Sequence, residues 1–166
     1  GSEMCIRDRF YDSKEEMVKN NKKFPNHFTK LEELEWITEQ DIPIPEDIKH
    51  TSVPYDHWLK LCHDFYNNSY GIDIVAVYKK QYIASTDIHV YKSEPHKGWT
   101  GGLGVLKKFR RQGIATALKI KAIETLLKKG ITEVRTDNEE NNPMYKINVE
   151  LGFKPVPFSL DYSLKI

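Results

Sequence analysis

One stretch of the sequence decides the fold: Leu103-Gly104-Val105-Leu106-Lys107-Lys108-Phe109-Arg110-Arg111-Gln112-Gly113-Ile114-Ala115. It begins as an apolar strand, turns through a basic loop and opens a long amphipathic helix. Cationic side chains crowd the start of this helix, although the helix macrodipole already places partial positive charge there. Free backbone N–H groups, a glycine and a positive dipole end together form a phosphate site, so we interpret the turn as a pyrophosphate site. A solvated basic turn is the alternative interpretation.

The residues after this stretch predict a regular order of elements. Apolar residues recur every fourth position from Ile114 to Leu126, which predicts a helix that ends at Gly130. Residues 131–137 then read as a strand, and an asparagine-rich loop follows. Pro143 suits the first position of a last helix, which Gly152 ends.

Together these features resemble a known family. Arg110-x-x-Gly113-x-Ala115, placed after a strand that ends at Val105, resembles the acyl-CoA signature of the GNAT superfamily of N-acetyltransferases. The resemblance covers residues 29–166 and is strongest over 98–157. It implies an α/β (α+β) fold, in which a mixed, mostly antiparallel central sheet is splayed at the acyl-CoA site and flanked by helices.

The resemblance implies acetyl-CoA as co-substrate and assigns residues to it in three groups. The strand supplies backbone contacts to the pantetheine arm from Leu103, Gly104 and Val105. The pyrophosphate is held by Arg110, Arg111, Gln112, Gly113, Ile114 and Ala115, and Thr116 adds a hydroxyl. The other side of the cofactor is closed by Asn138, Asn141 and Asn142. Turn chemistry and helix capping are the alternative role of these asparagines.

The sequence departs from the family at the catalytic acid. Many GNAT enzymes place a tyrosine four residues before the glycine of a final Gly-Phe pair, as the acid for the departing thiolate, and this chain has Asn148 there. We expect Asn148 to be buried and hydrogen-bonded, either near the thioester or to backbone in the core. An amide cannot titrate, so Tyr145 is a substitute candidate, and departure of the thiolate without protein assistance is the other alternative.

The catalytic base has one candidate pair on a strand. Over residues 81–91 a period of two places Asp87 and His89 on one face, opposite Tyr82 and Ile88. Because histidine is the side chain suited to proton transfer near neutral pH, this face is a candidate lining of the acceptor cleft, and a merely solvated face is the alternative. The expected reaction is direct attack by a neutral amine, with a backbone N–H near Val105 stabilising the oxyanion.

The middle of the chain predicts two helices, a hairpin and a further strand. The helices are expected over 29–40, with Leu31, Leu34, Trp36 and Ile37 inward, and over 54–67. The strands are expected over 72–78 and 81–91, joined at Lys79-Lys80, and over 99–106, with a bulge at Gly101-Gly102.

Composition sets the broad class. A chain of 166 residues with a net charge of +1 fits one domain and gives no indication of nucleic-acid binding. Cys5, Cys62 and the histidines show no metal-ligand spacing, so we expect no metal and a reducing cytoplasm. No apolar run is long enough to span a membrane.

The first 28 residues are expected to lie outside the acetyltransferase domain, which we assign to 29–166. Gly1-Ser2 resembles a tag-cleavage scar, and residues 3–9 resemble a translated sequencing adapter of the kind found in metagenomic assemblies. No strand is expected before Thr29, so the native N-terminus is either truncated, replaced or part of a tandem two-domain protein.

Three functions remain open from the sequence. The first is acetyl-CoA-dependent N-acetylation of a small amine, such as an aminoglycoside-like polycation drawn by the acidic residues Glu39, Asp41, Glu46 and Asp47. The second is acetylation of a protein N-terminus or lysine, and the third is an acyl-CoA-binding module without turnover. Fold does not fix the acceptor. A monomer and a homodimer are both compatible with the apolar residues Val156, Phe158 and Leu160 of an expected last strand.

Overall fold

The computed structural model describes residues 4–11, 14–24, 26–44, 48–138 and 142–156. Within these residues a five-stranded sheet runs in the order β1-β2-β3-β4-β5. Its strands are β1 (Met4–Tyr11), β2 (Ser69–Tyr78), β3 (Gln81–Tyr91), β4 (Lys97–Val105) and β5 (Glu133–Arg135). Neighbouring strands are antiparallel except β4 and β5, which are parallel. The mixed, mostly antiparallel sheet expected from the sequence is confirmed.

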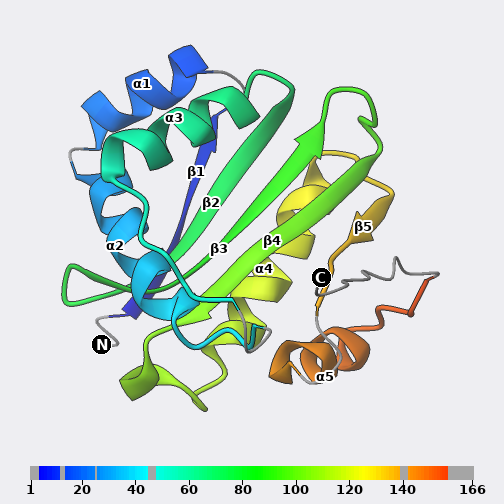
Figure 1. Cartoon of the computed structure of the whole chain (residues 1–166). Coiled ribbons are helices and arrows are strands. Elements are labelled where there is room, and N and C mark those ends of the chain that lie inside the picture. Colours follow the sequence, from blue (N-terminus) through cyan, green and yellow to red (C-terminus); the bar gives the residue numbers. More distant parts are fainter. Residues whose placement is uncertain (1–3, 12–13, 25, 45–47, 139–141, 157–166) are drawn as a thin grey trace, which may run out of the picture.

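Helices cover both faces of the sheet. They are α1 (Lys14–Lys23), α2 (His27–Glu39), α3 (Tyr55–Phe65), α4 (Ile114–Lys128) and α5 (Pro143–Glu150), with a short 3-10 turn η1 (Lys107–Phe109) before α4. Figure 1 shows α2 and α3 in front of the sheet and α4 behind it. None of the helices in the described ranges is long and apolar enough to cross a membrane.

Each face of the sheet buries its own apolar cluster. The cluster under α4 includes Ile72, Ile74, Ile88, Leu118 and Leu126. The cluster under α1, α2 and α3 includes Met17, Phe28, Leu31, Tyr66 and Val75. Ile37 was expected inward and is instead 54% exposed, because the buried stripe of α2 runs through Leu31, Leu34 and Thr38.

The N-terminal strand corrects an expectation. β1 pairs with β2 in unbroken register from Met4↔Tyr78 to Tyr11↔Gly71, so the expectation that no strand precedes Thr29 is wrong. The strand was not recognised because its charged residues do not look like a strand, although an edge strand tolerates charged side chains that a central strand does not. β2 is almost wholly buried and needs a partner on this edge. The artefactual and metagenomic origin of residues 1–9, and the division of the chain at residue 28, stay predictions.

Two irregularities set which residues share a face. Lys79 and Lys80 both have positive φ, which suits the tight turn that joins β2 and β3. Ile83 is then an extra residue in β3, so that Ala76 pairs with Ala84 and Val77 with Tyr82. Tyr82 therefore packs in the cluster under α2, on the side of Asp87 and not opposite it as expected.

The bulge expected at Gly101-Gly102 is confirmed. Thr100 pairs with Ile88 and Leu103 with Thr86, which leaves both glycines opposite the single residue Asp87. Of the expected last strand, Val156 lies outside any strand, while Phe158 and Leu160 lie outside the described residues. Glu46, Asp47 and Asn141 also lie outside the described residues.

Candidate active site

The strands β4 and β5 form a fork. They pair only over Lys97↔Glu133, Gly98↔Val134 and Trp99↔Arg135, and β4 then continues to Val105. Beyond Trp99, within the described residues, that edge of β4 has no strand beside it. Its backbone N–H and C=O groups can bond an extended ligand as an added strand would, which fits a pantetheine arm. Leu103, Gly104 and Val105, the residues predicted to contact the arm, lie on this open stretch.

The basic loop ends in an open helix N-terminus. Gly113 is the N-cap of α4 with φ 76°, and a Cβ added there would meet nothing within 4 Å. The first helical bond runs from Ala117 N to Gly113 O at 2.9 Å, so the amides before Ala117 have no helical acceptor. Such an end fits a phosphate group. Arg111 and Gln112 are exposed beside it, whereas Ile114 is buried and can offer only its backbone.

Part of the basic loop is neutralised by the chain itself. Arg110 donates from Nε to Val105 O at 2.8 Å and from Nη2 to Asp41 Oδ2 at 2.6 Å. Lys107 Nζ lies 2.8 Å from the other oxygen of Asp41. Hydrogen bonds from Lys107 and Arg110 hold the pKa of Asp41 below its usual value. Asp41 thus anchors the loop, and the positive charge of Lys108 and Arg111 has no ion pair within the described ranges.

The asparagines take local roles in the structure. Asn142 caps α5, because its Oδ1 accepts from Met144 N at 2.9 Å. Asn148 is buried, as expected, and donates from Nδ2 to Asn138 Oδ1. The Oδ1 atom of Asn148 is buried and has no partner among the described residues. Tyr145, the substitute acid, is 43% exposed on α5.

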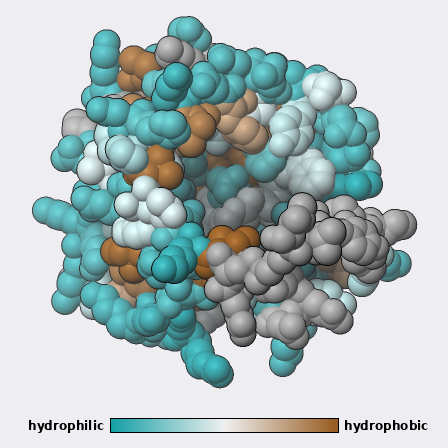
Figure 2. All heavy atoms as spheres, in the orientation of Figure 1, coloured by the Kyte–Doolittle hydropathy of each residue, from teal (hydrophilic) through white to brown (hydrophobic). Residues whose placement is uncertain are grey.

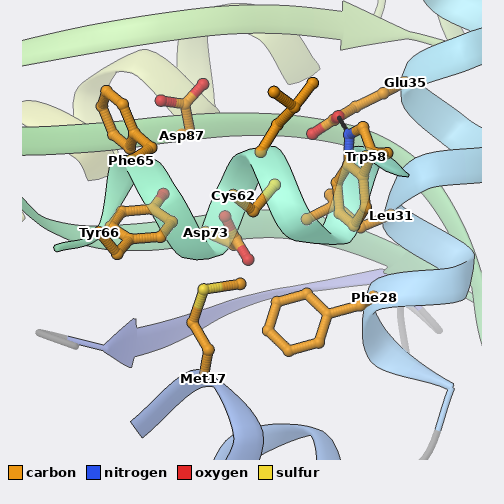
Figure 3. Close-up of a pocket in the computed structure, with 11 residues that line it drawn as sticks. Met17, Phe28, Leu31, Glu35, Trp58, Cys62, Phe65, Tyr66, Asp73 and Asp87 are labelled. Atoms are coloured by element: carbon orange, nitrogen blue, oxygen red, sulfur yellow. Dashed lines mark hydrogen bonds between the residues drawn. The ribbon is translucent and has the colours of Figure 1, made fainter. Parts of the chain in front are cut away.

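A pocket with three carboxylates lies on the face of the sheet that α2 and α3 cover, between these helices and the strands β2 and β3 (Figure 3). Its volume is about 400 Å³. The carboxylates belong to Glu35, Asp73 and Asp87. The remaining lining is apolar or aromatic: Met17, Phe28, Leu31, Trp58, Leu61, Cys62, Phe65 and Tyr66. Figure 2 shows this face of the molecule hollowed near its centre, with hydrophobic residues on the rim.

Glu35 is the most perturbed acid of this pocket. Trp58 Nε1 donates to Glu35 Oε2 at 3.2 Å. Burial and, to a smaller extent, the charges of Asp73 and Asp87 raise the pKa of Glu35 to about 8. Near neutral pH Glu35 therefore holds a proton until a cation enters the pocket. Burial also raises the pKa of Cys62 to about 12, so its thiol is a poor nucleophile.

Asp73 is held by a buried histidine. His27 Nε2 lies 3.1 Å from Asp73 Oδ2, and its Nδ1 lies 2.8 Å from the Tyr82 hydroxyl. His27 is fully buried and its ring is also in contact with Phe28. This chain of contacts fixes the direction in which the Asp73 carboxylate points.

Asp87 connects the pocket to the fork. A Cβ at Gly101 would collide with its carboxylate, so Asp87 lies directly over the β4 bulge. His89 Nδ1 lies 3.3 Å from Asp87 Oδ2, and the His89 ring stacks on Trp99 at 6.5 Å. The structure thus brings the predicted base candidates together, with Asp87 in the pocket. Sequence reasoning missed Glu35 and Asp73. For Asp73 the available signal was a carboxylate as the second residue of the otherwise apolar strand expected over 72–78.

Comparison with known proteins identifies the class. A model of the "Acetyltransferase (GNAT) family" matches residues 29–153, three quarters of the chain. The chain belongs to the GNAT family of acetyltransferases. A comparison with curated proteins gave no match.

Solved structures share the fold at low identity. An aminoglycoside acetyltransferase, meta-AAC0020, from an uncultured soil metagenomic sample and in complex with sisomicin is 19% identical, with a TM-score of 0.62 over 98% of this chain and 97% of that chain. The aminoglycoside N-acetyltransferase AAC(6')-Iy in complex with CoA is 18% identical, with a TM-score of 0.64 over 100% and 97%. A transcriptional regulator from Bacillus halodurans C-125 is 15% identical, with a TM-score of 0.64 over 97% and 99%. These similarities show the fold alone.

Within the described residues, no group of three or more histidine, cysteine, aspartate or glutamate side chains is arranged to hold a metal ion.

Proposed function

We propose that this acetyltransferase moves an acetyl group from acetyl-CoA to a primary amine of a small cationic molecule, in a ternary complex. One observation carries the proposal. The pocket with three carboxylates reaches the β4 bulge through Asp87, so a cation held there has its amine beside the fork. We also propose that the protein works in the cytoplasm, as a monomer or homodimer.

The cofactor side rests on the fork and the open helix end. We assign the pantetheine arm to the free edge of β4 from Leu103 to Val105, and the pyrophosphate to residues 110–116. A free backbone N–H of this edge stabilises the oxyanion that forms at the thioester carbonyl. Asn138, Asn141 and Asn142 stay proposed as contacts on the far side of the fork.

Asp87 is the proposed proton acceptor for the attacking amine. Its carboxylate lies between the pocket and β4, where an amine that attacks the thioester must pass. His89 holds one carboxylate oxygen at 3.3 Å and is a positioning residue for it. Much of the rate acceleration would come from holding amine and thioester at attack distance.

The pocket favours a compact polycation over a peptide. Its volume, about 400 Å³, lies within the range of small-molecule sites. Aromatic rings from Trp58, Phe65 and Tyr66 can face an ammonium group, and three acids can balance more than one positive charge. An aminoglycoside fits this chemistry, and two structural neighbours at low identity are aminoglycoside acetyltransferases.

A thiol-release assay with acetyl-CoA tests the proposal. The panel contains aminoglycosides, polyamines, amino acids and short peptides. We expect release with polycationic amines, and an increase in their KM in Asp73→Asn. Asp64→Asn, an exposed carboxylate on α3, is the matched control and should leave KM unchanged. Release only with peptides would favour the protein acetyltransferase, and acetyl-CoA binding without release would favour the binding module.

A further inference from the structure

A lysine is buried at the closed end of the fork. Lys119 comes from α4 and is 2% exposed. Its Nζ donates to Thr100 Oγ1 at 2.6 Å and to Thr136 Oγ1 at 3.1 Å. Thr100 directly follows the last paired residue of β4, and Thr136 directly follows the last paired residue of β5. The ammonium group therefore bridges the two strands at the point where they separate.

This ammonium group has no carboxylate partner in the described part of the chain. Its two recorded acceptors are neutral hydroxyls, and the ring of Phe153 lies 5.4 Å from Nζ. Burial lowers the pKa of Lys119 to about 8, and the more distant charges of Asp137 and Asp87 oppose this shift. A buried cation without a counterion is unfavourable for folding, so an apolar side chain would serve packing better.

The departing sulfur has no other evident acid. The amide of Asn148 cannot give up a proton at neutral pH, and Tyr145 is exposed on α5. An extended arm that entered at Gly113 and followed the free edge of β4 would run toward the bulge. Thr100 and the Lys119 ammonium lie next to that bulge, on the α4 side of the sheet.

We propose that Lys119 protonates the sulfur of coenzyme A when the acetyl group leaves. This inference rests on the proposed function. The amine nitrogen forms a bond to the carbonyl carbon, the carbon–sulfur bond breaks, and its electron pair stays on sulfur. Lys119 Nζ gives one proton to this sulfur, while the attacking nitrogen loses one proton to Asp87. Lys119 then takes a proton from water and Asp87 releases its own, so no other reactant is needed.

The arrangement separates the acid from the base. Asp87 lies over Gly101 on the pocket side of β4, and Lys119 bonds Thr100 on the α4 side. The bulge between them carries two glycines and therefore no side chain that could block either group. Acid and base thus meet the thioester from opposite faces of one strand.

The test measures the thiol of bound coenzyme A rather than turnover alone. The thiolate absorbs in the ultraviolet, so its titration can be followed in the complex of coenzyme A with the full chain. We expect the bound thiol to ionise at lower pH in the wild type than in Lys119→Met, with a roughly tenfold difference in acid constant. Affinity for desulfo-coenzyme A, which lacks the sulfur, should be equal in both proteins. Turnover should fall about 100-fold in the variant, the lower end of what general acid–base catalysis contributes, with the amine KM unchanged.

Two further variants keep the test decisive. Lys121→Met removes a lysine two positions along α4 that pairs with Asp8 at 3.6 Å, and it should behave as the wild type. Lys119→Arg keeps the charge, so the bound thiol should still ionise early, but turnover should fall because guanidinium does not release its proton.

The overturning results are distinct. Equal thiol titration in the wild type and Lys119→Met overturns the proposal, and so does a loss of desulfo-coenzyme A affinity in that variant, which would show a structural role. If Lys119→Met does not fold, unchanged turnover in Lys119→Arg overturns it. If the wild type binds neither coenzyme A nor the desulfo compound, the proposed function itself fails.

Discussion

The two faces of the sheet differ in the ionisable group that burial perturbs, a lysine on one face and a glutamate on the other. On the α4 face, burial lowers the pKa of Lys119 to about 8. On the face of α2 and α3, burial raises the pKa of Glu35 to about 8. Desolvation disfavours the charged form of both groups, so one cause moves a base and an acid to the same pH range. Both faces therefore hold a group that can exchange a proton near neutral pH, one beside the fork and one in the pocket with three carboxylates.

The largest effect is expected from a change at Asp87, which lies between the pocket with three carboxylates and the fork. Asp87→Asn removes the carboxylate that joins the pocket to the fork but keeps its shape. Since general-base catalysis contributes about 10²- to 10⁴-fold, kcat/KM for the amine should fall by that factor. Steady-state kinetics over a pH series checks this, and acetyl-CoA affinity should not change. A fall of less than threefold would remove Asp87 from the mechanism.

The next largest effect is expected at the N-terminus of α4, where we propose that the pyrophosphate binds. Arg111→Glu reverses an unpaired charge at the N-terminus of α4, where the helix end itself favours an anion. Coenzyme A affinity should fall by roughly 10- to 100-fold, the worth of one hydrogen bond to a charged group. Calorimetric titration measures it. Lys128→Glu, at the far end of the same helix, serves as the control and should bind normally.

Stability against pH tests the acid of the amine face. The pKa of Glu35 is raised from 4.5 to about 8, so between these values the folded state keeps a proton that the unfolded state has lost. Wild-type stability should therefore fall as the pH rises from 4.5 to 8 and then level off. Glu35→Gln should remove this slope and be about 1–3 kcal/mol more stable than the wild type at pH 8.5. Urea unfolding at pH 5 and pH 8.5 measures it, and parallel slopes for both proteins would contradict the assignment.

The smallest expected effect concerns Lys119 on the α4 face, where stability should change with pH in the opposite direction. The pKa of Lys119 is lowered from 10.5 to about 8, so between these values the unfolded state holds a proton that the folded state lacks. Wild-type stability should rise with pH over this range, and Lys119→Met should be about 1 kcal/mol more stable at pH 7. Thermal unfolding at pH 7 measures it. A variant less stable than the wild type would show that the lysine supports the fold.

The two faces also differ in how far the sequence predicts them. The cofactor face depends on neighbouring residues: strand, basic turn, Gly113 and helix follow one another along the chain. Local turn and helix chemistry therefore sufficed to predict this order of elements. The burial of Lys119 has no comparable local signal in the sequence, and only the position of the fork explains it.

The amine face depends on distant elements, and the sequence predicted little of it. A regular hairpin through Lys79-Lys80 would pair Asp73 with Thr86, and only the extra residue Ile83 pairs it with Asp87. Glu35 joins them because α2 docks on the sheet, a long-range event without a local signal. The edge strand β1 was missed because pairing with β2, and not its own composition, makes it a strand.

Asp41 connects the proposed binding sites of the two substrates. It follows α2, which contributes Glu35 to the amine pocket, and it binds Lys107 and Arg110 of the cofactor loop. Under the proposed function, a pyrophosphate that drew these cations away would release Asp41 at the end of α2. The two binding events are then thermodynamically coupled, and each substrate changes the affinity of the other by the same factor. High salt screens the Asp41 pairs, so the coupling should weaken as ionic strength rises.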